Sequence, residues 1–185
     1  MTRPTAADLA AAYGRGIADV LAPGLDVLFC GINPALYSAA TGFNFARPGN
    51  RFWPALYRSG FTPRLLRPDE QAELPAYGLG ITNLVDRATA RADELGPAEL
   101  AAGGRALAAR VRANRPGWVA VLGLGAYRQA FGYRDARVGA RPERLAGARV
   151  WVLPNPSGLN AHFTLDRLAE EFRSLRLEVR PGAHP

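Results

Sequence analysis

The chain has 185 residues, enough for one medium-sized domain with its own core but too few for two independent domains. Its formal charge of +7 suits a polyanionic partner, and every one of its 23 basic residues is an arginine. The lack of lysine excludes a Walker A phosphate loop and lysine Schiff-base chemistry, while one cysteine excludes an internal disulfide and argues against zinc or iron–sulfur sites.

The first elements expected along the chain are a helix, a strand and a long loop. Residues 5–21 are rich in alanine and predict an amphipathic N-terminal helix. Residues 26–30 form a short apolar run between Gly24 and Gly31, which predicts a buried strand. Residues 31–50 are rich in Gly, Pro and Asn and indicate a long loop with a short helix, and long loops in compact domains are often functional.

Strands and helices alternate in the remainder of the chain. This alternation predicts an α/β fold, a three-layer sandwich in which helices flank a mainly parallel sheet of about four strands. One domain is expected over residues 1–180, with residues 181–185 as a disordered tail. Further strands are expected at residues 79–85, 118–122 and 149–153, and helices at residues 51–59, 63–74, 97–114, 126–131 and 164–175.

The sequence gives no sign of a membrane or secretory segment. No run approaches the roughly 18 apolar residues of a membrane span, and the first residues lack the charged and apolar regions of a signal peptide. We therefore expect a cytoplasmic protein, associated with the nucleoid if DNA is its partner.

Two loops follow the expected first and fourth strands, and ligands of open α/β sheets bind beyond such strand ends. In the first loop, Asn33 offers an acceptor and a donor that could hold a water or a base edge, although an Asn here can also cap a turn. Phe45 follows Gly42 and could stack on an extruded base or belong to the core. Arg47 and Arg51 lie beside a helix start and suit phosphate binding.

The loop after the fourth strand is short, stiffened by proline and apolar at its tip. Such a loop can wedge into a base stack, or it can be an ordinary strand–helix turn. We regard His162 as a structural residue or a phosphate contact rather than a catalyst. The loop consists of Asn155, Pro156, Ser157, Gly158, Leu159, Asn160, Ala161 and His162.

Together these segments resemble the mismatch-specific uracil-DNA glycosylases and their thymine-DNA glycosylase relatives, a branch of the uracil-DNA glycosylase superfamily. The resemblance covers about residues 26–175 and leaves the N-terminal helix outside. It rests on six segments in a fixed order, namely Gly31–Pro34, Thr41–Phe43, Pro48–Trp53, Ile81–Arg87, Gly103–Arg105 and Asn155–Leu159.

The resemblance implies a uracil-glycosylase fold and a role for several residues. Asn33 matches the residue that positions the attacking water, and Phe45 matches the aromatic that stacks on the flipped base. Gly158 and Leu159 match the wedge that contacts the opposite guanine. The same resemblance implies a base pocket with Gly31, Ile32, Ser38 and Asn83, and a DNA-binding region with Asn155, Pro156, Ser157, Asn160, Arg51 and His162.

This chain departs from some members of the family at two places. Asn83 stands where some members carry lysine, which leaves its role in the pocket open. Asn160 and Ala161 stand where some members place an arginine shortly after the wedge leucine. Contacts with the orphan guanine are therefore expected to differ from those members.

The chemistry of base removal fits these residues. Breaking the N-glycosidic bond develops negative charge on the leaving pyrimidine, which amide donors stabilise. An amide is a weak base, so such a site should favour weakly paired bases, with G:U preferred over A:U. A carboxylate could supplement Asn33, and the candidates are Asp86, Asp93 and Glu94. Asp93 is included as a possible catalytic residue, whereas Asp86 can simply pair with an arginine.

The sequence thus predicts a monofunctional DNA glycosylase that excises uracil opposite guanine, and it leaves open whether thymine or modified cytosine is also a substrate. The expected partner is duplex DNA with a mismatched uracil, bound by a monomer without cofactor, metal or membrane. Two alternatives remain open, a glycosylase that also acts on A:U pairs or single strands and a non-catalytic DNA-binding α/β domain. Asn33, Phe45 and the Leu159 wedge occurring together favour the enzyme, because a pure binder needs no such combination.

Overall fold

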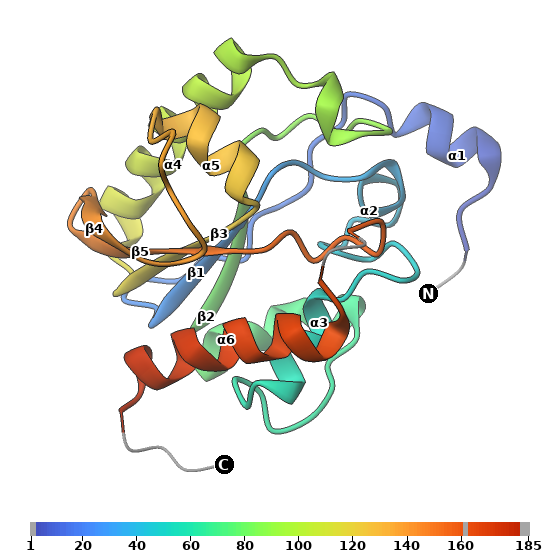
Figure 1. The fold of residues 1–185 in the computed structure, drawn as a ribbon. Coiled ribbons are helices and arrows are strands. Elements are labelled where there is room, and N and C mark those ends of the chain that lie inside the picture. The colour runs from blue at the N-terminus through green and yellow to red at the C-terminus, as the bar shows by residue number, and fades with distance from the viewer. Residues whose placement is uncertain (1–2, 161–162, 182–185) are drawn as a thin grey trace.

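The computed structural model describes residues 3–160 and 163–181, which are arranged around one central sheet (Figure 1). The sheet order is β2-β1-β3-β5-β4. Four strands run parallel and β4 pairs antiparallel with β5 at one edge. The strands of this described region are β1 (Val27–Gly31), β2 (Leu79–Asn83), β3 (Trp118–Leu122), β4 (Gly139–Leu145) and β5 (Ala148–Leu153).

Helices cover both faces of the sheet and complete three layers, which confirms the predicted α/β fold. Figure 1 shows α3 and α6 together on one face and α4 with α5 on the other. None of the helices described has the length and apolar character needed to cross a membrane. The α-helices are α1 (Ala6–Ala11), α2 (Leu36–Thr41), α3 (Phe52–Arg58), α4 (Pro97–Asn114), α5 (Leu124–Phe131) and α6 (Leu165–Val179), and the 3₁₀ helices are η1 (Pro68–Tyr77) and η2 (Ala92–Glu94).

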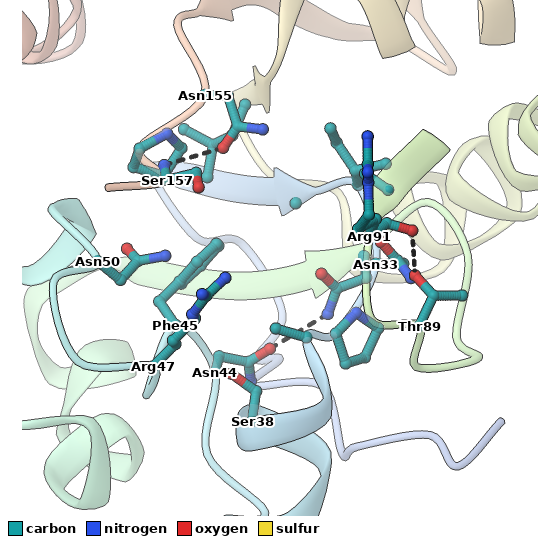
Figure 2. A pocket seen from close by; sticks show the side chains of 18 of the residues that line it. Asn33, Ser38, Asn44, Phe45, Arg47, Asn50, Thr89, Arg91, Asn155 and Ser157 are labelled. Carbon is teal, nitrogen blue, oxygen red and sulfur yellow. Dashed lines mark hydrogen bonds between the residues drawn. The ribbon is translucent and has the colours of Figure 1, made fainter. Parts of the chain in front are cut away.

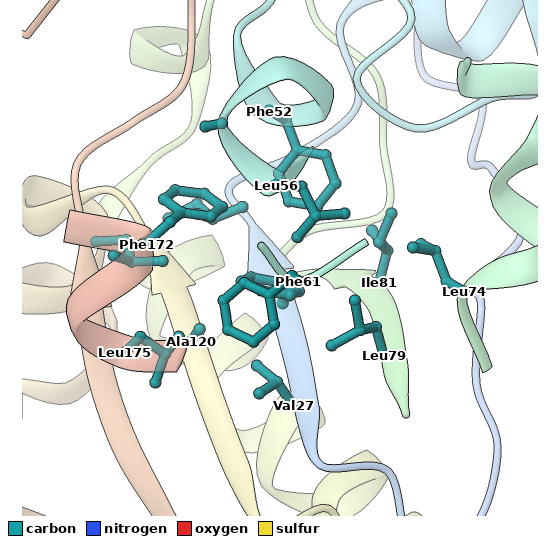
Figure 3. Close-up of a cluster of buried hydrophobic side chains, with 14 of the residues drawn as sticks. Val27, Phe52, Leu56, Phe61, Leu74, Leu79, Ile81, Ala120, Phe172 and Leu175 are labelled. Carbon is teal, nitrogen blue, oxygen red and sulfur yellow. The ribbon is translucent and has the colours of Figure 1, made fainter. Parts of the chain in front are cut away.

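The parallel strands are buried on both faces, which explains why they appear in the sequence as unbroken apolar runs. Phe29 of β1 points to the α3 and α6 side, where its ring centroid lies 5.4 Å from that of Phe52 and 5.6 Å from those of Phe61 and Phe172. Figure 3 shows Phe52, Phe61 and Phe172 of this cluster between the helices and the strands. Cys30 points to the opposite core, where burial raises the pKa of its thiol, as expected for an inert cysteine.

Helix α4 lies unusually close to the end of β2. A Cβ on Gly103 would lie 2.5 Å from the carbonyl oxygen of Leu84, and a Cβ on Gly104 would lie 2.9 Å from that of Ala130. Only glycine allows this approach without displacing backbone. Gly103 thus lets α4 pack against the start of the loop that follows β2, which forms one wall of the functional site, and Gly104 lets α4 pack against α5.

The predicted N-terminal helix over residues 5–21 is wrong in its extent, because α1 ends at Ala11. None of the residues of α1 is buried, so no apolar stripe favours a longer helix. The chain turns at Gly14, where φ is +75° and the amide donates to the carbonyl of Ala88. It then runs extended, and Val20 exchanges two backbone hydrogen bonds with Ile81 of β2.

The predicted count of four strands is one too low for the described part of the chain. The additional strand, β4, alternates half-buried and exposed residues and carries Arg141, Pro142 and Glu143. Proline and charged side chains are typical of edge strands, where one side of the backbone faces solvent. The same features hide a strand from a search for continuous apolar runs.

Candidate active site

A pocket of about 350 Å³ lies beyond the carboxyl ends of the parallel strands. Its lining combines the end of β1, helix α2 and the loops that follow β2 and β5, so segments far apart in the sequence meet here. Figure 2 shows Asn155 and Ser157 on one wall, with Asn44 and Ser38 on the opposite one. The two loops that the sequence singled out therefore face the same cavity, as the topology of such a sheet requires.

The floor of the pocket is Gly31, the last residue of β1. A Cβ at this position would lie 2.5 Å from Asn83 Oδ1 and 3.2 Å from the ring of Phe45. Glycine therefore keeps open the space between the amide of Asn83 and the aromatic ring. Both side chains line the pocket, as does Ile32.

Asn33 lines the pocket, and two hydrogen bonds fix the orientation of its side-chain amide. Its Nδ2 donates to the carbonyl oxygen of Arg87 at 3.0 Å and to Oγ1 of Thr89 at 2.7 Å. A carbonyl can only accept, so the atom bonded to it must be the amide nitrogen. Both amide hydrogens are thereby used, and Oδ1 has no protein donor among the residues described. This oxygen is an acceptor held at a fixed place in the site.

Thr89 is a site residue that the sequence analysis missed. It is buried, lines the pocket and donates its hydroxyl hydrogen to the carbonyl of Arg91 at 2.7 Å, so the hydroxyl oxygen is free to accept from Asn33. Residues 34 and 89 lie side by side because Thr89 N donates to the Pro34 carbonyl. No local motif marks Thr89, since its role arises from this long-range contact.

Asn44 is a second residue that the sequence analysis did not assign. It is 2% exposed and lines the pocket, and its Oδ1 accepts a hydrogen bond of 3.1 Å from Nδ2 of Asn83. Asn83 itself is 5% exposed, and its Oδ1 has no donor within the described ranges. The pair places a second ordered amide in the pocket, apart from Asn33.

The aromatic wall is Phe45, whose backbone adopts the left-handed region with φ of +54°. A non-glycine residue rarely occupies this region, and the surrounding contacts hold it there. One side of its ring stacks on Phe52, with centroids 4.2 Å apart. Ser38, which the resemblance places in the base pocket, accepts at Oγ from the amide of Ala46 at 3.2 Å and so braces the Phe45 loop.

The loop after β5 presents an exposed leucine. Leu159 is 75% exposed, and its amide donates to Ser157 Oγ at 3.3 Å. Asn155 Oδ1 accepts from Ser157 N, and the Asn155 carbonyl accepts from Asn160 Nδ2. A Cβ on Gly158 would lie 2.5 Å from the carbonyl oxygen of Gly49, so the loop packs directly against the 47–50 segment. These contacts give a stiff loop with an apolar tip.

Arg51, which the sequence predicts to bind phosphate, makes its side-chain hydrogen bonds within the protein. Its guanidinium is part-buried and donates to the carbonyls of Ser157, Asn160 and Phe163, at 2.8 Å in the case of Asn160. Its backbone amide donates to the Pro156 carbonyl at 2.9 Å. Arg51 thus holds the exposed loop from within the protein. His162, predicted beside this loop, lies outside the described residues.

The three candidate carboxylates, Asp86, Asp93 and Glu94, lie in different environments. Asp93 is on the rim of the pocket, with its side chain 62% exposed and paired with Arg91 at 2.5 Å. Asp86 is not among the pocket-lining residues and pairs with Arg110 at 3.1 Å, as expected if it simply forms an ion pair with an arginine. Glu94 accepts from the hydroxyl of Tyr13 and the amide of Arg91. None of the three is a buried base directed at Asn33.

A family model for the uracil DNA glycosylase superfamily matches residues 18–176 of the chain. The chain belongs to this superfamily. The match covers most of the domain, including both pocket loops, and it supports DNA N-glycosylase activity with DNA as the partner. The short helix α1 lies outside the matched residues.

A solved structure whose name refers to a uracil DNA glycosylase has the same fold. It is the solution NMR structure of a uracil DNA glycosylase candidate from Methanosarcina acetivorans, with a TM-score of 0.59 and 20% sequence identity. The alignment covers 88% of this chain and 98% of that one. At this identity the likeness shows the shared fold alone.

Proposed function

We propose that this protein is a monofunctional DNA glycosylase that flips a uracil opposite guanine into the pocket and hydrolyses its N-glycosidic bond. The observation that carries the proposal is the orientation of Asn33, a pocket-lining residue whose Nδ2 makes two hydrogen bonds, so that Oδ1 remains as a fixed acceptor. An acceptor held in this way can position a water molecule for attack on the sugar carbon C1′.

The proposed reaction leaves positive charge on the sugar and negative charge on the base as the bond from C1′ to N1 breaks. The electron pair of that bond leaves with the base, the water oxygen bonds to C1′, and a water proton passes to solvent. Asn33 orients the water but cannot take its proton, since an amide is a very weak base. Rate therefore depends on how readily the base leaves, and uracil is a better leaving group than cytosine.

The pocket walls support the choice of a pyrimidine. The ring of Phe45 offers a stacking surface, and stacking contributes about 1–3 kcal/mol per base. The amide of Asn83 presents Oδ1 and its second Nδ2 hydrogen, which complement the N3–H and O4 groups of uracil. A cavity of about 350 Å³ lies at the small end of the range for ligand pockets.

Leu159 supports base flipping because an exposed apolar side chain on a stiff loop can fill the gap that a flipped nucleotide leaves. A base in a G:U mismatch costs less to unpair than one in a normal pair, which favours mismatched uracil. We include no strand-cutting step, because the sequence has no lysine to form a Schiff base with the sugar. We further propose that the protein acts as a monomer at the nucleoid.

The proposal is tested with end-labelled duplexes that carry G:U, A:U or G:T, together with a single strand that carries uracil. Each is incubated with the protein, and half of each sample is then treated with alkali to cut abasic sites. We expect alkali-dependent cleavage that is fastest for G:U. Cleavage of none of the substrates would contradict the enzyme, and cleavage without alkali would contradict a monofunctional one. Excision from A:U pairs and from single strands at the same rate as from G:U would show the broader specificity.

A further inference from the structure

Gln71 of η1 holds Asn44 from behind the pocket, without itself lining it. Its Oε1 accepts from the backbone amide of Asn44 at 2.9 Å and from Asn44 Nδ2 at 3.1 Å. The same Nδ2 also donates to the carbonyl of Ala18 at 3.3 Å. Asn44 in turn accepts from Asn83, so three amide side chains form a chain that ends at the pocket floor.

The direction of every hydrogen bond in this chain is determined by two backbone groups. The backbone N–H of Asn44 can only donate, so the Gln71 atom beside it must be the oxygen. The carbonyl of Ala18 can only accept, so the Asn44 atom facing it must be the nitrogen. Asn44 Oδ1 therefore faces Asn83, and the atom of Asn83 that meets it must be Nδ2.

We propose that Gln71 is a positioning residue that sets the base selectivity of the pocket by fixing the polarity of the Asn83 amide. This inference rests on the proposed function. Uracil presents a donor at N3 and an acceptor at O4, whereas cytosine presents an acceptor at N3 and a donor at N4. With Nδ2 tied to Asn44, the Oδ1 and the free Nδ2 hydrogen of Asn83 suit uracil only.

A flipped Asn83 would suit cytosine, and the amide chain opposes this flip. To accommodate it, Asn44 would have to turn its own amide and place Oδ1 against Gln71 Oε1 and the Ala18 carbonyl. Three acceptors would then face one another in a buried site, at the cost of the hydrogen bonds that they now make. Gln71 thereby acts on the base through two intermediate side chains and touches no substrate atom.

The test uses the full-length protein and three variants. Gln71→Met removes the acceptor and keeps the length of the side chain. Gln71→Glu keeps an acceptor for the backbone N–H and the Nδ2 group of Asn44. Gln129→Met, at an exposed glutamine of α5, is the matched control. The readout is the ratio of dissociation constants for two duplexes, one with 2′-fluorodeoxyuridine opposite guanine and one with 2′-fluorodeoxycytidine opposite adenine. Fluorine at C2′ prevents cleavage, so binding is measured alone.

Both test bases are mispaired. The free energy needed to open each pair is a property of the DNA, so it is the same for every variant and cancels when their ratios of dissociation constants are compared. We expect the preference for uracil to fall roughly tenfold in Gln71→Met, within the range for a bidentate base contact. Gln71→Glu and Gln129→Met should keep the wild-type ratio. The inference is overturned if Gln71→Met, shown by thermal melting to be folded, keeps the wild-type ratio of dissociation constants within twofold. It is also overturned if Gln71→Glu loses the preference for uracil as much as Gln71→Met does, or if the wild type itself shows no preference.

These outcomes are separate from the fate of the proposed function. A wild-type protein that prefers uracil in binding but excises none would contradict the glycosylase alone. Conversely, excision of uracil with an unchanged binding ratio in folded Gln71→Met would contradict the role of Gln71 alone. Should Gln71→Met fail to fold, the ratio in Gln71→Glu together with the side-chain amide exchange rates of Asn44 decides the matter, because slow exchange is expected wherever the acceptor is kept.

Discussion

The side-chain nitrogen of Asn33 lies 2.7 Å from the hydroxyl oxygen of Thr89, and this contact helps to fix the orientation of the Asn33 amide. The Thr89 hydroxyl donates its own hydrogen to the Arg91 carbonyl, so toward Asn33 it can only accept. The amide oxygen that is central to the proposed reaction is thus oriented by a residue 56 positions away in the chain.

Replacing Thr89 by valine should therefore lower the excision rate. Valine keeps the shape of threonine but offers no acceptor to Asn33, so one net hydrogen bond of about 1 kcal/mol is lost, or roughly a fivefold fall in rate. Thr89→Ser should retain most of the activity. Single-turnover excision from a G:U duplex is the measurement, and a folded Thr89→Val variant with the wild-type rate would show that Thr89 does not position Asn33.

Replacing Arg51 by methionine should loosen the Leu159 loop. Hydrogen bonds from a charged donor contribute about 1.5–3 kcal/mol, so we expect the free energy of unfolding to fall by about 2–3 kcal/mol. Arg51→Lys should only partly restore stability, since an ammonium lacks the planar fork that reaches several carbonyls. Urea unfolding gives the comparison.

The exposed Arg47 is the matched control for Arg51. It lines the pocket mouth, and no carboxylate pairs with it within the described ranges. Arg47→Met should leave unfolding unchanged but weaken duplex binding and reduce its salt dependence by about one phosphate contact. If instead Arg51→Met acted only on salt-dependent binding, Arg51 would be a phosphate contact after all.

Asp93→Ala should change the excision rate by less than about twofold. The carboxylate is solvated and paired with Arg91, whereas an efficient general base must lie within hydrogen-bond reach of the attacking water. Asp135→Ala, at another exposed aspartate, controls for the loss of one negative charge on DNA binding. A rate more than tenfold lower for Asp93→Ala than for this control would establish Asp93 as a catalytic residue.

Glu99 links stability at low pH to the site. It accepts from Arg87 Nε at 2.6 Å and from the amide of Gly96 at 3.1 Å, and the Arg87 pair lowers the pKa of Glu99 from 4.5 to about 2. Because the folded-state pKa is lowered, the carboxylate stabilises the protein above about pH 4.5, and this contribution is lost as the pH falls toward 2.

Glu99→Gln should therefore be less stable than the wild type at pH 6 and equally stable near pH 2, as measured by urea unfolding across this range. The carbonyl of Arg87 also accepts from Asn33, so the variant should lose some activity at neutral pH. Glu178→Gln on α6 is the control for a missing charge. A stability difference that did not shrink between pH 4.5 and 2 would contradict the ion pair as its source.

The four parallel strands could be predicted from the sequence within one residue at each end, apart from the carboxyl end of the second, which differs by two residues, because both of their faces are buried. The edge strand β4 could not, since its exposed face carries Arg141 and Glu143. The helix expected over residues 5–21 failed because alanine spacing alone does not show whether a core is present to receive it.

The pocket was predictable where a residue lies just beyond the end of a strand, as Asn33 and Asn155 do. Thr89, Asn44 and Gln71 were not, because their importance comes from hydrogen bonds between segments that no local pattern connects. Arg51 was assigned to DNA from its charge, although the carbonyls of a neighbouring loop are its partners. Charge shows that a side chain can bind an anion, and only the fold shows whether it does.

The most direct test of the account compares single-turnover excision of uracil from a G:U duplex by the wild type and by Asn33→Ala. Asn114→Ala, at the far end of α4, is the matched control. We expect alkali-labile product with the wild type and the control, a rate at least about a hundredfold lower with Asn33→Ala, and similar duplex binding by all three proteins. Excision by Asn33→Ala at the wild-type rate would contradict the account.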